Sequence, residues 1–482
     1  MTDSKLTLFI CFPRTNYHSS AQLLLKMAML HVFIFLLLGC GVAQSSKLVR
    51  VSPLQFSGED TQEEDEEDCS VAKPRKSSTS IPLMHVQAKC SPFRNEKSTW
   101  LYTVLESING DEQRYRAITR AATSFTTQED AVLPLAIKNG DYIINLGFGT
   151  PQQSFYTLVD TGSDITWIPC ATCTDCAGDV FDASKSSTYK YLSCSSETCQ
   201  ALGSTPTCGN YKCSIKQTYG DGSEVTQLLS TESLAVASQS MPAFVFGCAT
   251  DRTGLITSTP GLVGFGRESI SFVSQTANLL QKTFSYCIPS STATGCLSLG
   301  KSTLSSSGLQ FTSLLTNSAK PSFYYVALNG VSVGEDRVAV AAMEQSSGKG
   351  TIIDSGTTIT RLAEPAYGSV RDSFVRQLSN LSRAAPYSIF DACFNFPSRD
   401  VDVPEITLHF DKDVDVPLPP TNYLISTNVQ GSVVCLALAP PPKSLSDSGV
   451  SILGSFQQRD FQVVYDIPAS RLGIAPQSCK GC

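Results

Sequence analysis

One short phrase built around an aspartate occurs twice in the chain, roughly two hundred residues apart. LVDTGSDITWI begins at Leu158 and IIDSGTTITRL begins at Ile352, and each has an aspartate third, a glycine fifth, an isoleucine eighth and a threonine ninth. An apolar pair stands before each aspartate. An aspartate, a hydroxyl residue and a glycine after an apolar run predict a tight turn at the end of a β-strand. The chain is therefore expected to form two equivalent turns.

The repeat extends beyond these two phrases. A strand-like run precedes each aspartate, and an apolar-apolar-glycine element follows it at a nearly constant interval. Gly264 comes 104 residues after Asp160, and Gly454 comes 100 residues after Asp354. The same elements in the same order indicate that one domain occurs twice in the chain. A length of 482 residues also exceeds what one hydrophobic core normally organises, so two domains are expected.

The sequence after Leu133 has the pattern of a β protein. Short runs such as FYTLVD, AFVFGC, SVVCLAL and FQVVYD are rich in β-branched and aromatic residues and are bounded by turn formers. Apolar residues recur every three or four positions in SISFVSQTANLL (269–280) and PAYGSVRDSFVRQLSN (365–380), which predicts short helices there. We therefore expect an all-β fold with a few short helices.

Two equivalent turns on a pseudo-twofold axis would bring Asp160 and Asp354 face to face. Carboxylates about 3 Å apart cannot both ionise, so the pair would share one proton and its apparent pKa values would split. The ionised aspartate can take a proton from water while the protonated one donates to a carbonyl oxygen. This pattern predicts acid–base hydrolysis of an amide without a covalent enzyme intermediate.

With both phrases, both apolar-apolar-glycine elements and the cysteine-rich stretch after WIPC, the chain resembles a pepsin-like aspartic protease of the plant nepenthesin-like branch from Leu133 to Cys482. The resemblance implies a bilobal all-β fold of two pseudo-twofold-related, barrel-like lobes, with Asp160 and Asp354 as the catalytic pair. It also implies a set of residues that support the pair, namely Thr161, Gly162, Ser163, Ser355, Gly356 and Thr357.

The family also has a flap, a hairpin that closes over the substrate and carries a tyrosine near its tip. KQTYGDGSEV fits that hairpin, so the resemblance assigns substrate contacts to Tyr219 and Gly222 and makes Trp167 the partner of the tyrosine. By itself, YGDG would predict only a turn. A flap would exclude water from the scissile bond and order the substrate backbone.

Eighteen cysteines favour an oxidising compartment, and seven of them lie between Trp167 and Tyr219. The C-x-x-C spacing could instead bind zinc, but disulfides fit an exported chain better. The odd number requires a partner outside the stretch, which we expect to be Cys248. The family pattern implies the pairs Cys170–Cys173, Cys176–Cys248, Cys194–Cys213, Cys199–Cys208, Cys287–Cys479 and Cys393–Cys435, and leaves Cys296–Cys482 as a guess.

The N-terminal third has a different composition. Residues 1–43 end in an apolar run of secretory type, although Met27 or Met29 could be the start and a dual or plastid address is an alternative. We interpret residues 44–130 as a removable prosegment, with the acidic run GEDTQEEDEEDC predicted to be disordered and a basic helix expected across an acidic cleft. A simple linker is the alternative. The lobes are predicted at 131–305 and 306–482.

Charge and motif content exclude several function classes. The net charge is −7 with a pI near 5.3, and from Ala131 onward acidic residues outnumber basic ones 28 to 22, which argues against nucleic acid and anionic membranes as partners. Only His409 of the four histidines lies in the predicted mature part, so zinc and serine hydrolase chemistry lack residues. We expect His409 to be a strand residue with a packing or surface role, and we expect no metal or other cofactor.

The sequence therefore predicts an aspartic endopeptidase that is made as a secreted zymogen and cleaves proteins or peptides at acidic pH. The alternative is a catalytically weak pepsin-fold binding or inhibitor protein of the plant cell wall, since fold alone does not establish activity. A DNA-binding protease of the chloroplast nucleoid is a third interpretation. We expect a monomer in the apoplast, with vacuole or chloroplast as alternatives, and a glycosylation sequon at Asn380.

Overall fold

The structure is a computed structural model, and all described residues belong to one compact unit, Lys47–Cys482. It describes residues 47–52, 79–94, 100–123, 132–133, 142–173, 176, 179–202, 206–219, 223–254, 259–290, 294–305, 307–345, 347–428 and 430–479. The predicted leader (1–43) and the acidic run GEDTQEEDEEDC lie outside the described residues. In the part of the chain that is described, no helix is long and apolar enough to cross a membrane.

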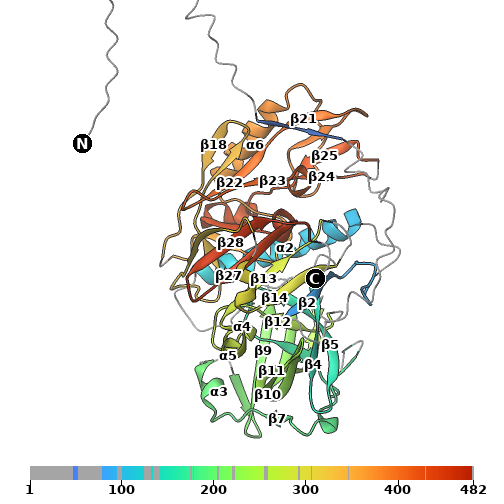
Figure 1. Cartoon of the computed structure of the whole chain (residues 1–482), viewed down its shortest axis with the longest axis vertical. Coiled ribbons are helices and arrows are strands. Elements are labelled where there is room, and N and C mark those ends of the chain that lie inside the picture. The colour runs from blue at the N-terminus through green and yellow to red at the C-terminus, as the bar shows by residue number, and fades with distance from the viewer. Residues whose placement is uncertain are drawn as a thin grey trace, which may run out of the picture. The chain divides into compact units, whose positions relative to one another are not determined.

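The described chain is mostly β, as predicted, and Figure 1 shows its two lobes in green and in orange to red. The N-terminal lobe contains β4 (Tyr142–Phe148), β5 (Gln153–Asp160), β6 (Trp167–Pro169), η3 (Ala183–Lys185), β7 (Lys190–Tyr191), α3 (Glu197–Ala201), β8 (Pro206–Gly209), β9 (Lys212–Tyr219), β10 (Glu224–Val236), β11 (Gln239–Thr253), β12 (Leu262–Gly264), α4 (Phe272–Gln275), α5 (Ala277–Leu280), β13 (Thr283–Cys287), β14 (Gly295–Leu299) and η5 (Lys301–Ser305).

The C-terminal lobe follows the same plan with more short strands. It contains β15 (Gln310–Leu315), β16 (Tyr325–Val326), β17 (Leu328–Val333), β18 (Asp336–Ala339), β19 (Gly350–Ile353), α6 (Ala366–Gln377), β20 (Cys393–Asn395), β21 (Val401–Pro404), β22 (Ile406–Phe410), β23 (Asp415–Leu418), η6 (Pro420–Asn422), β24 (Leu424–Ser426), β25 (Val433–Leu436), η7 (Lys443–Ser448), β26 (Val450–Leu453), η8 (Ser455–Gln458), β27 (Phe461–Asp466) and β28 (Arg471–Pro476). Helices α4, α5 and α6 lie where apolar periodicity predicted them.

The sequence repeat corresponds to a structural repeat. In the N-terminal lobe, β5 and β12 run parallel with Asp160 opposite Gly264. In the C-terminal lobe, β19 and β26 run parallel with Ile353 opposite Leu453, immediately before Asp354 and Gly454. Each lobe therefore places an aspartate at the end of one strand and a glycine at the end of its parallel neighbour.

The second glycine of each pair is required by a close approach. A side chain at Gly264 would lie 2.3 Å from the backbone of Asp164, and one at Gly454 would lie 2.5 Å from the carbonyl oxygen of Thr358. Real Cβ atoms do not come that close to a backbone. Only glycine lets the chain after each aspartate cross tightly over the neighbouring strand.

A sheet shared between the lobes joins them. β13 pairs with β14 on one side and with β27 of the C-terminal lobe on the other. Its residue Phe284 stacks on Tyr465 with ring centroids 4.4 Å apart, so this sheet carries part of the core. Two carboxylates on separate lobes are thereby held in a fixed relation.

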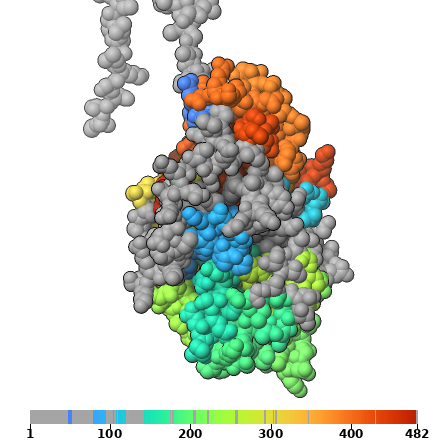
Figure 2. Space-filling view, turned by 90° about the vertical axis from the view of Figure 1, so that its right-hand side faces the viewer, coloured from blue at the N-terminus to red at the C-terminus, as the bar shows by residue number. Residues whose placement is uncertain are grey.

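The described part of the predicted prosegment consists of three pieces, 47–52, 79–94 and 100–123, and β3 (Val132–Leu133) follows them. β1 (Leu48–Val51) pairs with β21, and β2 (Ser80–His85) lies between β14 and β4. The third piece is the long helix α2 (Trp100–Thr123). In Figure 2, the blue segments of this region lie against both the green and the orange parts of the molecule.

Four predicted disulfide pairings are wrong, although Cys248 does bond to the cysteine-rich stretch as expected. The structure contains Cys170–Cys248, Cys173–Cys176, Cys194–Cys208 and Cys199–Cys213 in place of Cys170–Cys173, Cys176–Cys248, Cys194–Cys213 and Cys199–Cys208. For Cys170 the physical reason is strand register. β6 runs parallel to β11 with Ile168 opposite Cys248, which brings Cys170, the residue after β6, close to Cys248.

The remaining cysteine predictions fare differently. Cys287–Cys479 and Cys393–Cys435 are confirmed, and the second pair joins directly opposed residues of β20 and β25. Cys296 is disulfide-bonded, but the proposed partner Cys482 lies outside the described residues. These bonds are spread over both lobes, as expected for a chain that folds in an oxidising compartment.

Candidate active site

Asp160 and Asp354 end equivalent strands and are both buried, with 1% and 0% of their surface exposed. Each carboxylate accepts a hydrogen bond from the backbone N–H two residues further on. Gly162 N lies 3.0 Å from Asp160 Oδ1, and Gly356 N lies 3.1 Å from Asp354 Oδ1. The two phrases thus form the same turn, and the turn orients the carboxylate in each lobe.

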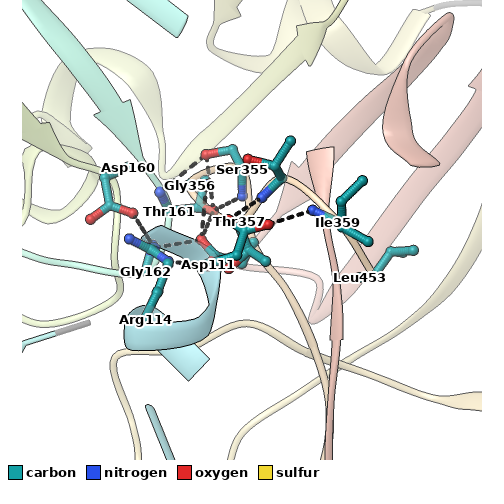
Figure 3. A network of polar contacts seen from close by, with 12 residues as sticks. Asp111, Arg114, Asp160, Thr161, Gly162, Ser355, Gly356, Thr357, Ile359 and Leu453 are labelled. Carbon is teal, nitrogen blue, oxygen red and sulfur yellow. Dashed lines mark hydrogen bonds and ion pairs between the residues drawn. The ribbon is translucent and has the colours of Figure 1, made fainter. Parts of the chain in front are cut away.

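The hydroxyl residues beside the aspartates interlock across the lobe boundary, as the resemblance implied. Ser355 N donates to Thr161 Oγ1 at 2.9 Å, and Thr161 N donates to Ser355 Oγ at 3.3 Å. The two hydroxyl oxygens are 3.2 Å apart. Figure 3 shows the contacts between Thr161 and Ser355, close to Asp160. Hydrogen bonds in both directions fix the spacing of the aspartates.

The hydroxyls two residues further on do not support the carboxylates equally. Thr357 Oγ1 donates to Asp354 Oδ2 at 2.6 Å. Ser163 is buried beside Asp160 and its hydroxyl acts to lower the pKa of that carboxyl, but no well-formed hydrogen bond joins the two side chains, so the predicted orienting contact is weaker in this lobe. The asymmetry coincides with a third group that enters the site.

That third group is Arg114 of helix α2, whose guanidinium lies between the two aspartates (Figure 3). Its Nε donates to Asp354 Oδ2 at 2.6 Å, while Nη2 donates to Asp354 Oδ1 at 2.8 Å and to Asp160 Oδ1 at 2.6 Å. One nitrogen atom is therefore within hydrogen-bond distance of both carboxylates. The Arg114 side chain has no exposed surface, so it fills the space between the aspartates.

The pKa values of Arg114 and Asp160 depend on burial as well as on the ion pairs between them. Burial opposes the charge on Arg114, but the two carboxylates outweigh it and raise its pKa. Burial raises the pKa of Asp160, Arg114 acts against that shift, and the neighbouring Asp354 adds to it. Asp160 Oδ2 is buried without a hydrogen-bond partner among the described residues. Protonation of Asp160 is thus favoured by burial and by the nearby carboxylate.

Asp111, one helical turn before Arg114, makes a second polar contact with the site. Its two carboxylate oxygens accept hydrogen bonds from Thr358 N at 2.8 Å and from Ile359 N at 2.7 Å. The side chain is buried, and burial raises the pKa of Asp111 to about 6, against the lowering effect of these N–H groups and of Arg361 and Arg114. The helix therefore binds the backbone that follows the second aspartate turn.

An apolar face and a tyrosine also hold α2 against the C-terminal lobe. Val104 and Ile108 join a buried cluster with Ile359 and Phe456. Tyr115 donates a hydrogen bond to the Val450 carbonyl at 2.6 Å. Burying aliphatic side chains contributes roughly 1.5–3 kcal/mol each, so packing supports the ion pairs.

The predicted flap is a hairpin of β9 and β10, with Thr218 opposite Glu224. Tyr219 is buried near its tip, and its hydroxyl accepts a 2.8 Å hydrogen bond from Trp167 Nε1. The pairing of Tyr219 with Trp167 that the resemblance implied is therefore present. Gly222 lies outside the described residues.

His409 is a buried residue of strand β22, in line with the expected packing role. Its Nε2 lies 2.6 Å from Ser332 Oγ and its Nδ1 lies 2.6 Å from Asp415 Oδ1, which is the connectivity of a serine hydrolase triad. Ser332, however, lies in β17 between β18 and β22, where backbone N–H groups bond to neighbouring strands. The described sheet thus offers this serine no free backbone donors for an oxyanion.

The described residues contain no group of three or more His, Cys, Asp or Glu side chains that could hold a metal ion. Asn380 of the glycosylation sequon is exposed just after α6, and its modification stays a prediction. Asp111 and Arg114 are the site residues that sequence reasoning missed. They are three residues apart on a predicted helix, so they share a face, and an acidic residue paired with a basic one on the face toward an acidic cleft was an available signal.

Comparisons with known proteins agree with this geometry. Two family models match, described as xylanase inhibitor N-terminal over residues 142–301 and xylanase inhibitor C-terminal over residues 323–476. The chain is 35% identical to Aspartyl protease family protein 2 of Arabidopsis thaliana over 463 residues, which cover 90% of this chain and 93% of that protein. The chain belongs to the plant aspartic protease family.

A second relative lies within the branch that the sequence suggested. Aspartic proteinase nepenthesin-1 of Nepenthes gracilis is 39% identical over 355 residues, covering 71% of this chain and 78% of that protein. The predicted family and enzyme class, an aspartic-type endopeptidase, are thereby confirmed. Among solved structures, Basic 7S globulin from soybean aligns with a TM-score of 0.57 and 23% identity over 71% of this chain and 95% of that one. That likeness shows the bilobal fold alone.

Proposed function

We propose that this plant aspartic protease is made as a secreted zymogen and hydrolyses peptide bonds at acidic pH by a water molecule activated between Asp160 and Asp354. The observation that carries the proposal is the single Arg114 nitrogen that hydrogen-bonds to both carboxylates. Two aspartates that can be bridged by one atom are close enough to share a proton once the arginine has left. The pair would then titrate as a unit.

The reaction follows from one proton held by two carboxylates. The ionised aspartate takes a proton from a bound water, and the water oxygen attacks the carbonyl carbon of the peptide. At the same time the protonated aspartate donates its proton to the carbonyl oxygen, which gives a tetrahedral gem-diol. The aspartate that took the proton from water passes it to the amide nitrogen and the C–N bond breaks. One gem-diol hydroxyl returns its proton to the other aspartate as the carboxylic acid forms, so the pair again holds one proton. Neither aspartate forms a covalent bond to the substrate.

The flap supplies the second requirement, which is exclusion of bulk water. Trp167 holds Tyr219 at the end of β9, the first strand of the hairpin. We propose that Tyr219 and Gly222 contact the substrate backbone when the flap closes. A closed flap would order the substrate and strengthen each electrostatic contact with the carboxylates.

We further propose that residues 44–130 are the prosegment and that α2 keeps the enzyme inactive. Arg114 forms an ion pair with both carboxylates and fills the position where the water would lie. Asp111 occupies two backbone N–H groups that an extended substrate could otherwise use. The predicted secretion signal at 1–43, the apoplast as destination and a monomeric state are parts of the same proposal.

The test is peptide hydrolysis by the processed protein across pH 3 to 7, with Asp160→Asn and Asp354→Asn compared with wild type. We expect each variant to lose roughly 10³-fold or more in kcat/KM, because each carboxylate exchanges a proton during bond cleavage. Asp372→Asn, on the exposed surface of α6, is the matched control and should retain wild-type turnover. Wild-type rates in either dyad variant would refute the mechanism.

A binding or inhibitor protein of the plant cell wall is the second candidate function. The observation that favours it is the description of both matching family models as xylanase inhibitor domains. The same digestion separates the two candidates. A folded, processed protein without peptide hydrolysis at any pH, together with inhibition of a xylanase, would support the inhibitor and overturn the protease.

A further inference from the structure

The first described segment of the chain forms a strand far from the two aspartates in the sequence. β1 pairs antiparallel with β21 of the C-terminal lobe over four residue pairs, and these two strands form a sheet of their own (Figure 1). Glu405 N donates to the Lys47 carbonyl at 3.0 Å and extends the ladder by one residue. Pro404, which cannot donate, stands opposite Leu48.

The side chains of β1 alternate between the core and solvent. Val51 is 1% exposed and belongs to the main hydrophobic core, and Val49 packs partly buried against it, whereas Leu48 is 46% exposed. This period of two is that of a strand with one buried face. The inward valines therefore contribute binding energy that the outward residues do not.

A charged pair adds specificity on the outer face. Arg50 Nε lies 3.0 Å from Asp402 Oδ1, and Arg50 Nη2 lies 3.3 Å from Asp402 Oδ2. Two parallel contacts from a guanidinium to a carboxylate define an orientation as well as a register. Because both side chains are largely exposed, their contribution to affinity is small.

Without β1, the β21 strand would be an edge with its N–H and C=O groups facing solvent and with Val401 and Val403 uncovered. Such an edge accepts an extended segment by strand addition, in which main-chain bonds give affinity and alternate side chains give specificity. The fitting partner has aliphatic side chains facing inward and a basic residue opposite Asp402. Residues Lys47–Val51 have that pattern.

We infer that the β21 edge is a docking surface for the segment Lys47–Val51, and that this segment keeps the prosegment bound after the chain is cut between α2 and β4. The inference rests on the proposed removal of the prosegment. None of the six disulfides whose two cysteines are both described joins a residue before Val132 to one after it. Cys90 of the prosegment is also disulfide-bonded, to a cysteine that is not among these six pairs, so the inference requires that this bond lies within the prosegment. While β1 stays docked, α2 is held close to the aspartates and rebinds readily.

The test uses the full chain, with a specific protease site introduced within residues 124–131 and an affinity tag ahead of Gln44. The tagged protein is immobilised, cut at pH 7, and the release of the C-terminal piece is followed with time. A non-reducing gel of the cut protein comes first, and pieces that stay joined there through Cys90 would overturn the inference. Val51→Ser should speed release about tenfold or more, because a buried aliphatic side chain is lost. Leu48→Ser, on the exposed face of the same strand, should release at the wild-type rate.

The charged pair gives a second, independent readout in the same assay. Asp402→Arg should speed release by about three- to tenfold, because it replaces an attraction by a repulsion. Glu335→Arg makes the same charge change at an exposed turn of this lobe and serves as the control. The exchanged pair Arg50→Asp with Asp402→Arg should restore slow release. Equal release by Asp402→Arg and Glu335→Arg would remove the specificity argument.

Hydrogen exchange distinguishes docking of β1 from retention by α2 alone. In the cut protein, the amides of Val403 and Glu405 should remain protected for as long as the prosegment stays bound. Rapid exchange there while α2 stays protected, or equal release rates for Val51→Ser and Leu48→Ser, would overturn the inference. None of these measurements depends on peptide hydrolysis by this protein itself, so the docking surface and the proposed enzyme activity can fail separately.

Discussion

Helix α2 and strand β2 both belong to the proposed prosegment, yet they bury titratable groups of opposite kinds. α2 buries the acid Asp111, and burial raises its pKa to about 6. β2 buries the base His85, which is 1% exposed, and burial with help from Arg459 lowers its pKa to about 3. The same cause, loss of water, thus disfavours charge in both places.

The consequences of the two shifts for docking have opposite signs. Asp111 has an ordinary pKa of 3.8 in the free segment, so the docked carboxyl, with a pKa of about 6, binds its proton more tightly. The contribution of Asp111 to docking is therefore largest in acid and declines as the pH rises through about 6. His85 in the free segment takes up a proton below about 6.5, whereas the docked imidazole stays neutral down to about 3. Its contribution is present at neutral pH and is lost between pH 6.5 and 3. A fall in pH therefore weakens the docking of β2 through His85, whereas through Asp111 it strengthens the docking of α2.

The largest expected effect concerns His85. Its Nδ1 accepts a hydrogen bond from Gln87 N at 3.1 Å and its ring packs edge-on against Tyr142, so the docked ring is the neutral form with a filled acceptor. Full protonation of the free segment should weaken docking by about 5 kcal/mol between pH 6.5 and 3. His85→Asn keeps an acceptor in the Nδ1 position and cannot titrate. Its release rate in the cut-chain assay should rise much less on acidification than that of wild type.

The outcome that would contradict this contrast is a shared pH profile. If His85→Asn and wild type show the same acceleration of release from pH 7 to pH 3, β2 is not the acid-sensitive part of the prosegment. The His409→Asn variant, which removes a buried histidine of the C-terminal lobe, controls for a general effect of losing an imidazole.

The next effect in size tests whether α2 holds mainly through Arg114. Arg114→Gln leaves both buried aspartates without their cation, and breaking a buried pair typically costs about 3 kcal/mol or more. The uncut variant should therefore hydrolyse peptide, whereas the uncut wild type should not. Arg116→Gln alters a half-exposed neighbour that pairs with Glu112, and it should stay inactive until cut. Inactivity of uncut Arg114→Gln would assign the block to packing instead of charge.

Asp111→Asn tests the opposite pH sign. Wild type should gain stability relative to this variant as the pH falls from 6 to 4, by about 3 kcal/mol at most, because only wild type takes up a proton on docking. Thermal unfolding of the two uncut proteins across this range measures the difference. If the stability of wild type relative to the variant instead increases as the pH rises, the N–H groups of Thr358 and Ile359 outweigh burial and keep Asp111 ionised.

The aspartate turns were predictable because their geometry is local. An apolar strand, an aspartate and a glycine specify the same turn wherever they occur, and the repeat requires the two turns to face each other. Gly264 and Gly454 could be placed for the same reason, since each follows its aspartate at a nearly equal interval. The fold class follows from the repeat together with the short alternating strands.

The features that could not be predicted depend on how the strands and helices pack and on which face of a helix contacts the rest of the protein. Cys194, Cys199, Cys208 and Cys213 are close in sequence, so spacing permits several pairings. The packing of helix α3 against the sheet makes the choice, because it brings Cys199 and Cys213 into one buried cluster. Arg114 is one of several basic residues on its helix. Its contact with the aspartates depends on how α2 rotates against the C-terminal lobe, which no local pattern specifies.

The smallest expected effect separates docking of α2 from titration altogether. Tyr115 donates to the Val450 carbonyl, and its hydroxyl lies 2.7 Å from Ser448 Oγ. Tyr115→Phe removes the hydroxyl while leaving the buried ring, so docking should weaken by about 1 kcal/mol, the net value of one hydrogen bond. Burial raises the pKa of Tyr115 to about 12, so the loss should be constant from pH 4 to pH 7. A loss that varies with pH in the cut-chain assay would mean that the α2 contact is coupled to His85 or Asp111, and the two regions would then respond to acid as one unit.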